Sequence, residues 1–316
     1  MEHTIARPKI NPFIRFFKRV AKDMRRNWTL YVLVAPVIVF YLLFHYRPMY
    51  GALIAFQNFR PALGVSGSPW VGFEHFIRFF QGPFFWRLMR NTFWLNVLLL
   101  AFGFPAPILL ALMMNEVRST VFKRTVQTVT YMPFFISAIV VVGIIQSFTL
   151  STGVINDIIV WFGGTRRNLL SDSSVWRTIF VTQDLWRNVG FGTIVYLAAL
   201  AGIDQEQYEA AMIDGAGRFR KIWNITIPGI MPTIVILLIL RMGSMMSLGF
   251  ETIMLMASPV VYEVSDVIGY YVFRVGIQQG NFSFATAVGL FNSVINFSML
   301  IIANAISRRV NETSLW

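Results

Sequence analysis

Long apolar runs without a formal charge constrain this chain more than any other feature. No charged residue lies between Arg124 and Asp157, and further uncharged runs occupy residues 28–46, 91–115, 222–240 and 283–307. A helix of about 20 mostly apolar residues is long enough to cross the hydrocarbon core of a bilayer. Continuous runs favour helices over a β-barrel, whose strands alternate apolar and polar residues. The sequence therefore predicts an all-α membrane protein.

Composition and charge agree with this class. Of the 316 residues, 56% are apolar and 13% are charged, whereas soluble domains carry about 25% charged residues. The net charge of +12 does not point to nucleic acid, because every lysine lies outside the apolar runs. The chain has no cysteine and three histidines, so we expect neither disulfides nor a metal site.

We predict six transmembrane helices. The strong ones are 28–46, 91–115, 126–150, 222–249 and 283–307. A weaker span near 178–203 carries Asp184 and Arg187, which are three residues apart and so able to pair on one helix face. All five lysines fall in the four segments that this topology places on one side, 1–27, 116–124, 204–221 and 308–316. The positive-inside rule therefore predicts that both termini are cytoplasmic.

The predicted organisation is one membrane domain, residues 28–307, between a basic amphipathic N-terminal segment (1–27) and a cytoplasmic tail (308–316). A helix within 11–27 either lies along anionic lipid or serves only as a solvated orientation signal. The outer loop 47–90 contains an amphipathic stretch, Phe73–Phe80, that predicts a surface helix. Val260–Gly276 is expected to form another outer or re-entrant element.

The polar loop 204–221 lies between two predicted spans. Helix-forming residues run from Gln205 to Asp214, and Asp204 is suited to cap the helix N-terminus. Gly215 is expected to end the helix in a left-handed conformation, and Pro228 and Pro232 to bend or restart the next one. From these properties alone, the loop is either a docking element or an amphipathic connector stabilised by lipid.

Residues 209–228 carry a longer pattern. It reads Glu-Ala-Ala, three residues, Gly, nine residues, and Ile-x-x-Pro. It resembles the "EAA" loop of binding-protein-dependent ABC importer permeases without a gap, with Ile227 where leucine is usual. The resemblance implies a type I ABC importer permease fold with six spans, in which the short helix is a cytoplasmic coupling helix that docks on an ATPase. The coupling residues it implies are Glu209, Ala210, Ala211, Asp214, Gly215 and Pro228.

Weaker sequence similarities bear on the transported substrate. Residues 46–59, 67–76 and 248–251 resemble the permeases of polysaccharide-type importers. This likeness implies an importer of oligosaccharides, with acidic ones such as alginate or aldouronate oligomers as the expected class.

The resemblance also implies partners. These are a second homologous permease in a heterodimer, a dimer of ABC ATPase subunits, an extracytoplasmic solute-binding protein and the lipid of a bacterial inner membrane, with no nucleic acid. The sequence has no Gly-Lys dipeptide and hence no Walker A phosphate loop. We therefore expect no catalytic residue and no cofactor in this chain, with ATP and Mg²⁺ bound by the separate ATPase. The alternatives are a secondary transporter, an intramembrane enzyme or a channel.

Ionisable and amide side chains inside spans are candidates for a substrate path. Arg241 lies deep in the fifth predicted span, where it would offer a planar donor fork to a carboxylate. The alternative is an internal ion pair with Glu251 or with a partner subunit. Asn292 and Asn296 share one face of the sixth span, and Gln146 lies in the third. These amides either line the path or hold helices together.

Overall fold

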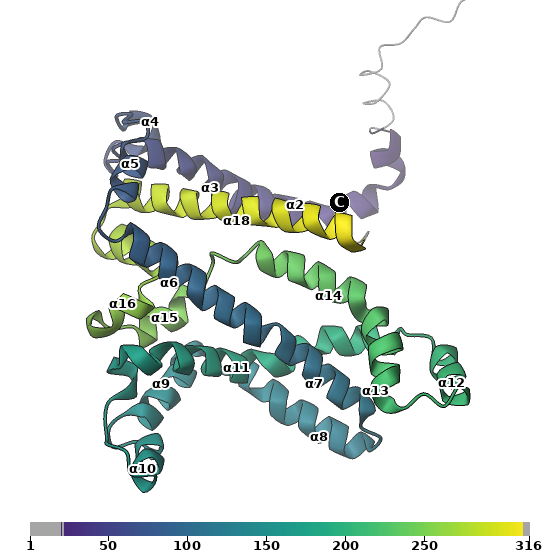
Figure 1. Cartoon of the computed structure of the whole chain (residues 1–316). Coiled ribbons are helices and arrows are strands. Elements are labelled where there is room, and N and C mark those ends of the chain that lie inside the picture. Colours follow the sequence, from purple (N-terminus) through teal and green to yellow (C-terminus); the bar gives the residue numbers. More distant parts are fainter. Residues whose placement is uncertain (1–19, 21, 312–316) are drawn as a thin grey trace, which may run out of the picture.

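The computed structural model describes residue 20 and residues 22–311, which Figure 1 shows as helices joined by short turns. Five helical stretches are long and apolar enough to cross a membrane: Trp28–Phe56, Phe85–Glu116, Ala138–Trp161, Arg218–Met242 and Phe282–Arg309. The prediction of an all-α membrane protein is confirmed. The basic segment 1–27 and the tail 308–316 lie largely outside the described residues.

The helices follow one another with few long connections. In chain order they are α2 (Trp28–Tyr41), α3 (Arg47–Met49), α4 (Gly64–Gly67), α5 (Glu74–Phe80), α6 (Phe85–Leu98), α7 (Pro105–Glu116), α8 (Thr120–Tyr131), α9 (Ala138–Thr149), α10 (Val154–Trp161), α11 (Ser173–Ala201), α12 (Gln205–Ile213), α13 (Arg218–Lys221), α14 (Ile227–Met242), α15 (Phe250–Met256), α16 (Tyr262–Ser265), α17 (Ile268–Phe273) and α18 (Phe282–Asn311).

The two ends of the molecule are formed by different sets of helices. In Figure 1 the beginning of α2, the turn from α7 to α8, α12 and the C-terminal end of α18 lie at the right. The small helices α4, α5, α10 and α16 lie at the left. The segments predicted to share the lysine-containing side therefore gather at one end of the fold.

The third span differs from its prediction. Residues 126–150 were expected to form one helix, but α8 ends at Tyr131 and α9 begins only at Ala138. Pro133 lies in the 3₁₀ turn between them, and Ile136 and Ser137 are extended. Proline lacks the N–H that would continue the helical ladder, so the two helices meet at an angle. The candidate span in this region is Ala138–Trp161.

The weak fourth span is a single helix of 29 residues, α11. It is not among the five apolar stretches. The side chain of Asp172 caps its N-terminus by accepting the Ser174 backbone N–H at 2.9 Å. The Ser174 hydroxyl, with this N–H, lowers the pKa of the Asp172 carboxyl.

The core surrounds α11. One buried cluster joins Trp176 and Phe180 of α11 to Leu95 of α6 and to Ile253 of α15. Trp176 is fully buried, and its indole N–H donates to the Met256 carbonyl at 3.2 Å. Farther along, Gly190 packs so closely on Thr130 of α8 that a Cβ there would collide with the Thr130 carbonyl.

The fifth span ends earlier than predicted. A continuous helical stretch runs from Arg218 to Met242, but residues 243–246 form turns and 247–249 are irregular, in place of the expected continuation. Pro228 lies in the first turn of α14, directly after a π-helical turn at Ile222–Thr226, and Pro232 lies inside α14 without ending it. The surface helix predicted at Phe73–Phe80 is α5, which buries His75 and Phe79.

Candidate functional site

Local sequence explains why α12 forms. The Asp204 carboxylate accepts the backbone N–H of Glu206 at 3.0 Å, which caps the helix N-terminus as predicted. Glu206 lies in the first turn, where the helix dipole favours negative charge. No residue of α12 is buried. Figure 1 shows the helix standing apart from the bundle at the right.

Gly215 reverses the chain after α12. Its φ of +71° lies in the left-handed region, which glycine adopts without steric cost. The Gly215 N–H donates to the Met212 carbonyl at 3.1 Å, and the Ala216 N–H donates to the Ala211 carbonyl at 2.8 Å. These bonds satisfy helix-end carbonyls in the manner of a glycine C-cap. The predicted turn is therefore present.

The loop offers an exposed, largely polar surface. Glu209, Ala210 and Asp214 are exposed, and Ala211 is half-buried. Ala211 and Asp214 line a notch of about 250 Å³ whose opposite wall holds Arg220 and Lys221. The small alanine side chains leave the α12 backbone accessible to a close partner.

Apolar side chains are exposed around the same loop. Ile213 is 87% exposed, Phe219 90% and Trp223 73%. Exposed apolar groups beside polar ones are typical of interaction surfaces. These residues carry no distinguishing sequence signal, because a predicted helix does not reveal which of its faces is buried.

Two contacts join the loop to the bundle. The Tyr208 hydroxyl lies 3.0 Å from the Thr226 hydroxyl, which belongs to the π-helical turn below α14. Arg218 pairs with Glu116 at the end of α7, with 3.8 Å between Nε and Oε2. These contacts connect the loop to the bundle at α14 and α7.

Arg241 lies in the last turn of α14 and lines a cavity of about 90 Å³. Asp184 of α11 lines the same cavity, while Glu251 does not. The alternative of an Arg241–Glu251 ion pair is wrong within the described residues, where no such pair forms. The Asp184–Arg187 pair does not form there either, and Asp184 instead accepts from the Asn188 amide at 2.9 Å.

The three predicted amides have different environments. Asn296 is buried and bonds both the backbone N–H of Met246 and the hydroxyl of Ser247. Gln146 donates to the Leu255 carbonyl at 3.1 Å. Asn292 has a buried carbonyl oxygen without a hydrogen-bond partner in the described chain. Asn296 and Gln146 therefore hold elements together.

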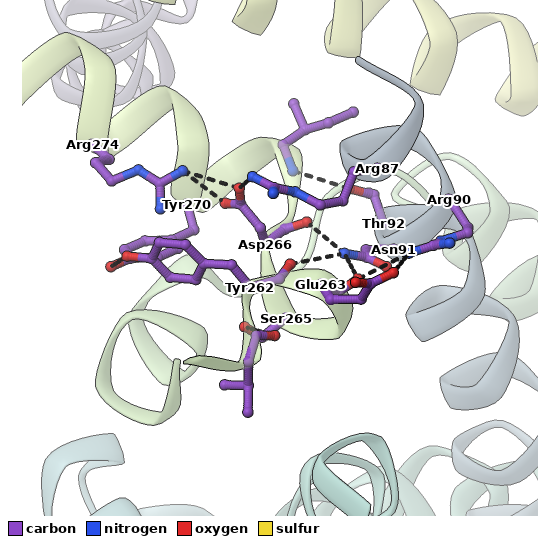
Figure 2. A network of polar contacts seen from close by, with 12 residues as sticks. Arg87, Arg90, Asn91, Thr92, Tyr262, Glu263, Ser265, Asp266, Tyr270 and Arg274 are labelled. Atoms are coloured by element: carbon purple, nitrogen blue, oxygen red, sulfur yellow. Dashed lines mark hydrogen bonds and ion pairs between the residues drawn. The ribbon is translucent and has the colours of Figure 1, made fainter. Parts of the chain in front are cut away.

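The structure brings together a further polar cluster at the opposite end from α12 (Figure 2). Asp266, between α16 and α17, is fully buried. Its carboxylate accepts from Arg87 of α6 at 2.7 Å and from Arg274 at 3.0 Å. Burial lowers the pKa of Arg274, but the charge and hydrogen bonds of Asp266 more than offset this and raise it.

Asn91 and Thr92 complete the cluster. The Asn91 amide donates to the Glu263 carbonyl at 2.9 Å, and the Thr92 hydroxyl accepts the Ile268 N–H at 3.0 Å. Figure 2 shows α6 fastened by these residues to the predicted outer element. No sequence pattern predicts this cluster, since the partners lie about 175 positions apart and only tertiary folding joins them.

Comparisons with known proteins agree with this geometry. Residues 103–312 match the family described as binding-protein-dependent transport system inner membrane component. Protein LplB of Bacillus subtilis is 48% identical over 93% of this chain and 92% of its own length. The polygalacturonan/rhamnogalacturonan transport system permease protein YteP of the same organism is 43% identical over 95% and 94%.

A solved structure shares the fold. A chain of a bacterial ABC transporter involved in the import of the acidic polysaccharide alginate superposes with a TM-score of 0.86 at 42% identity, covering 93% of this chain and 99% of that one. A second similar chain, at 42% identity and a TM-score of 0.86, comes from a bacterial alginate ABC transporter in complex with an alginate pentasaccharide-bound periplasmic protein. This chain belongs to the binding-protein-dependent transport system inner membrane component family, as the permease subunit of an ABC transporter.

Proposed function

We propose that this permease imports acidic oligosaccharides. The observation that carries the proposal is the likeness over nearly the whole chain to permeases whose names specify alginate and polygalacturonan, both uronic-acid polymers. The exposed loop 204–221, with its glycine turn and projecting α12, supports coupling to an ATPase. As a permease subunit the chain is not an enzyme and takes no cofactor, and the ATPase partner binds ATP.

The proposed topology has six spans with both termini cytoplasmic. We assign α11 as the fourth of the six spans, because 29 residues at about 1.5 Å each exceed the roughly 30 Å hydrocarbon core. Its charged side chains Arg177, Asp184 and Arg187 are only partly exposed within the bundle. The positive-inside rule places α12 and the lysines in the cytoplasm and α5 and α16 outside.

The mechanism is ATP-driven alternating access. A binding protein delivers sugar at the outer loops, and the ATPase dimer closes on α12 through Glu209, Ala210, Ala211, Asp214 and Gly215, with Pro228 at the start of α14. The contacts Tyr208–Thr226 and Arg218–Glu116 carry this movement into α14 and α7. A second homologous permease supplies the other half of the path. In this subunit the substrate path includes Arg241, Glu251 and Asn292.

Reconstitution tests this function. The permease, its partner permease, the ATPase and the binding protein are placed in proteoliposomes, and ATP-dependent uptake of tri-galacturonate is compared with that of neutral arabinotriose. We expect uptake of the acidic sugar. Preference for the neutral sugar would contradict import of acidic oligosaccharides and favour neutral ones. The 26% identity to an arabinooligosaccharide permease of Bacillus subtilis supports that alternative.

A further inference from the structure

A small polar cavity lies where α14 ends. It has a volume of about 90 Å³, enough for about three waters or one carboxylate group. Its polar lining comes from Asp184 on α11, Arg241 on α14, Ser247 in the following turn and Thr252 on α15. The cavity between α9 and α11 is by contrast lined chiefly by apolar side chains, whereas this cavity holds two opposite charges.

The two charges do not form a closed pair. Asp184 accepts a hydrogen bond from Asn188 at 2.9 Å and experiences the charges of both Arg241 and Arg187. No nitrogen of Arg241 lies within 4 Å of a described carboxylate oxygen, nor does its guanidinium donate a hydrogen bond to another described residue. A charge inside a membrane protein is costly unless something satisfies it. The space between Arg241 and Asp184 therefore suits a transient anionic group.

The backbone around the cavity is held in place. Residues 243–249 are not helical, and such backbone is tolerated at membrane depth where it is buried in protein or lines a polar cavity. Asn296 of α18 bonds both Met246 and Ser247, and a Cβ at Gly243 would approach Leu300 to 2.8 Å. Arg241 therefore projects from a fixed helix end, which favours specific recognition.

We propose that Asp184 is the resting counter-charge of Arg241, and that the carboxylate of a uronate residue replaces it as the sugar passes. The inference rests on the proposed function. Arg241 provides selectivity, because its planar guanidinium donates paired hydrogen bonds to a carboxylate. An ester or a hydroxyl cannot accept a comparable pair of bonds. Asp184 provides release, because it competes for Arg241 and prevents the sugar from remaining bound.

The experiment measures uptake by the reconstituted complex. The substrates are tri-galacturonate and its methyl ester, each supplied with the binding protein saturated. Arg241→Gln is expected to lower uptake of the acid by about tenfold or more, as for loss of a hydrogen bond to a charged group, and that of the ester by less than about twofold. Asp184→Asn is expected to lower two quantities for the acid and not for the ester. These are the half-saturating concentration of the sugar-loaded binding protein and the maximal rate of uptake.

The double variant Asp184→Asn/Arg241→Gln separates selectivity from a structural ion pair. We expect it to carry the acid and the ester at similar rates, without preference for the acid. A double variant that regains wild-type acid preference would overturn the inference, as would single variants that impair both sugars equally. Asp157→Asn, which removes an exposed carboxylate paired with Arg166, is the control for charge loss alone.

The wild-type complex distinguishes the two levels of the proposal. If the wild type imports the acid and Arg241→Gln keeps the same preference for acid over ester, only the role of the cavity is contradicted. A wild-type complex that imports no acidic sugar contradicts the proposed function and this inference with it.

Discussion

The side-chain carbonyl of Asn296 accepts a hydrogen bond from the backbone N–H of Met246 at 2.7 Å, and its amide donates to the Ser247 hydroxyl at 2.8 Å. Met246 lies in the turn where α14 has ended, so its N–H lacks a partner from a continuing helix. An amide from α18 replaces the helical bond and fixes this turn. Arg241, five residues earlier, is positioned by the same contact.

Replacement of Asn296 by alanine is expected to destabilise the permease by about 1–3 kcal/mol, because it leaves buried polar groups without partners. The measurement is the apparent melting temperature in detergent, in parallel with Asn292→Ala. Asn292 lies on the same helix face, but its buried oxygen has no hydrogen-bond partner in the described chain. Equal losses in the two variants would contradict the role given to Asn296.

Gly215→Ala is expected to reduce transport and sugar-stimulated ATPase activity of the assembled complex. Alanine in the left-handed conformation costs about 1–2 kcal/mol, so the turn after α12 shifts although no atom obstructs the new methyl group. Gly217→Ala is the matched control, since Gly217 has φ −70° and equally open surroundings. Coupled transport at the wild-type rate in Gly215→Ala would argue against a demanding fit at this turn.

Asp266→Asn is expected to destabilise the outer end of the fold by about 3–5 kcal/mol, because Arg87 and Arg274 would lose their buried counter-charge. Glu263→Gln in the same segment removes a carboxylate paired with Arg90, but that pair is exposed and is worth at most about 1 kcal/mol. Thermal unfolding and limited proteolysis of 257–281 compare the two. Similar stability of both variants would show that the cluster does not hold this element.

Gly190→Ala is expected to weaken packing of α11 on α8, because the new Cβ collides with the Thr130 carbonyl, which is backbone and unable to yield. Gly143→Ala on α9 meets nothing within 4 Å and is expected to be neutral or stabilising by up to about 1 kcal/mol. Expression level and melting temperature in detergent give the comparison. A tolerated alanine at 190 would mean that the two helices separate readily.

The sequence predicted the local features well because they depend on neighbouring residues. The cap at Asp204 and the turn at Gly215 were expected from residue type and position, and the structure has both. The break between α8 and α9 was missed, although Pro133 marks it, because uncharged residues continue on both sides. The length of α14 was overestimated because hydropathy does not reveal where a helix ends.

By itself the sequence determined the membrane class, most of the helical stretches, the loop 204–221 with its glycine turn, and the family, since apolar run length, charge position and motif spacing are properties of one linear chain. Only tertiary structure decided that Arg241 shares a cavity with Asp184 and not with Glu251, that Asn296 holds the end of α14, and that Asp266 lies between two arginines. These contacts join residues far apart in the chain. They depend on how helices pack, and no local pattern encodes that packing.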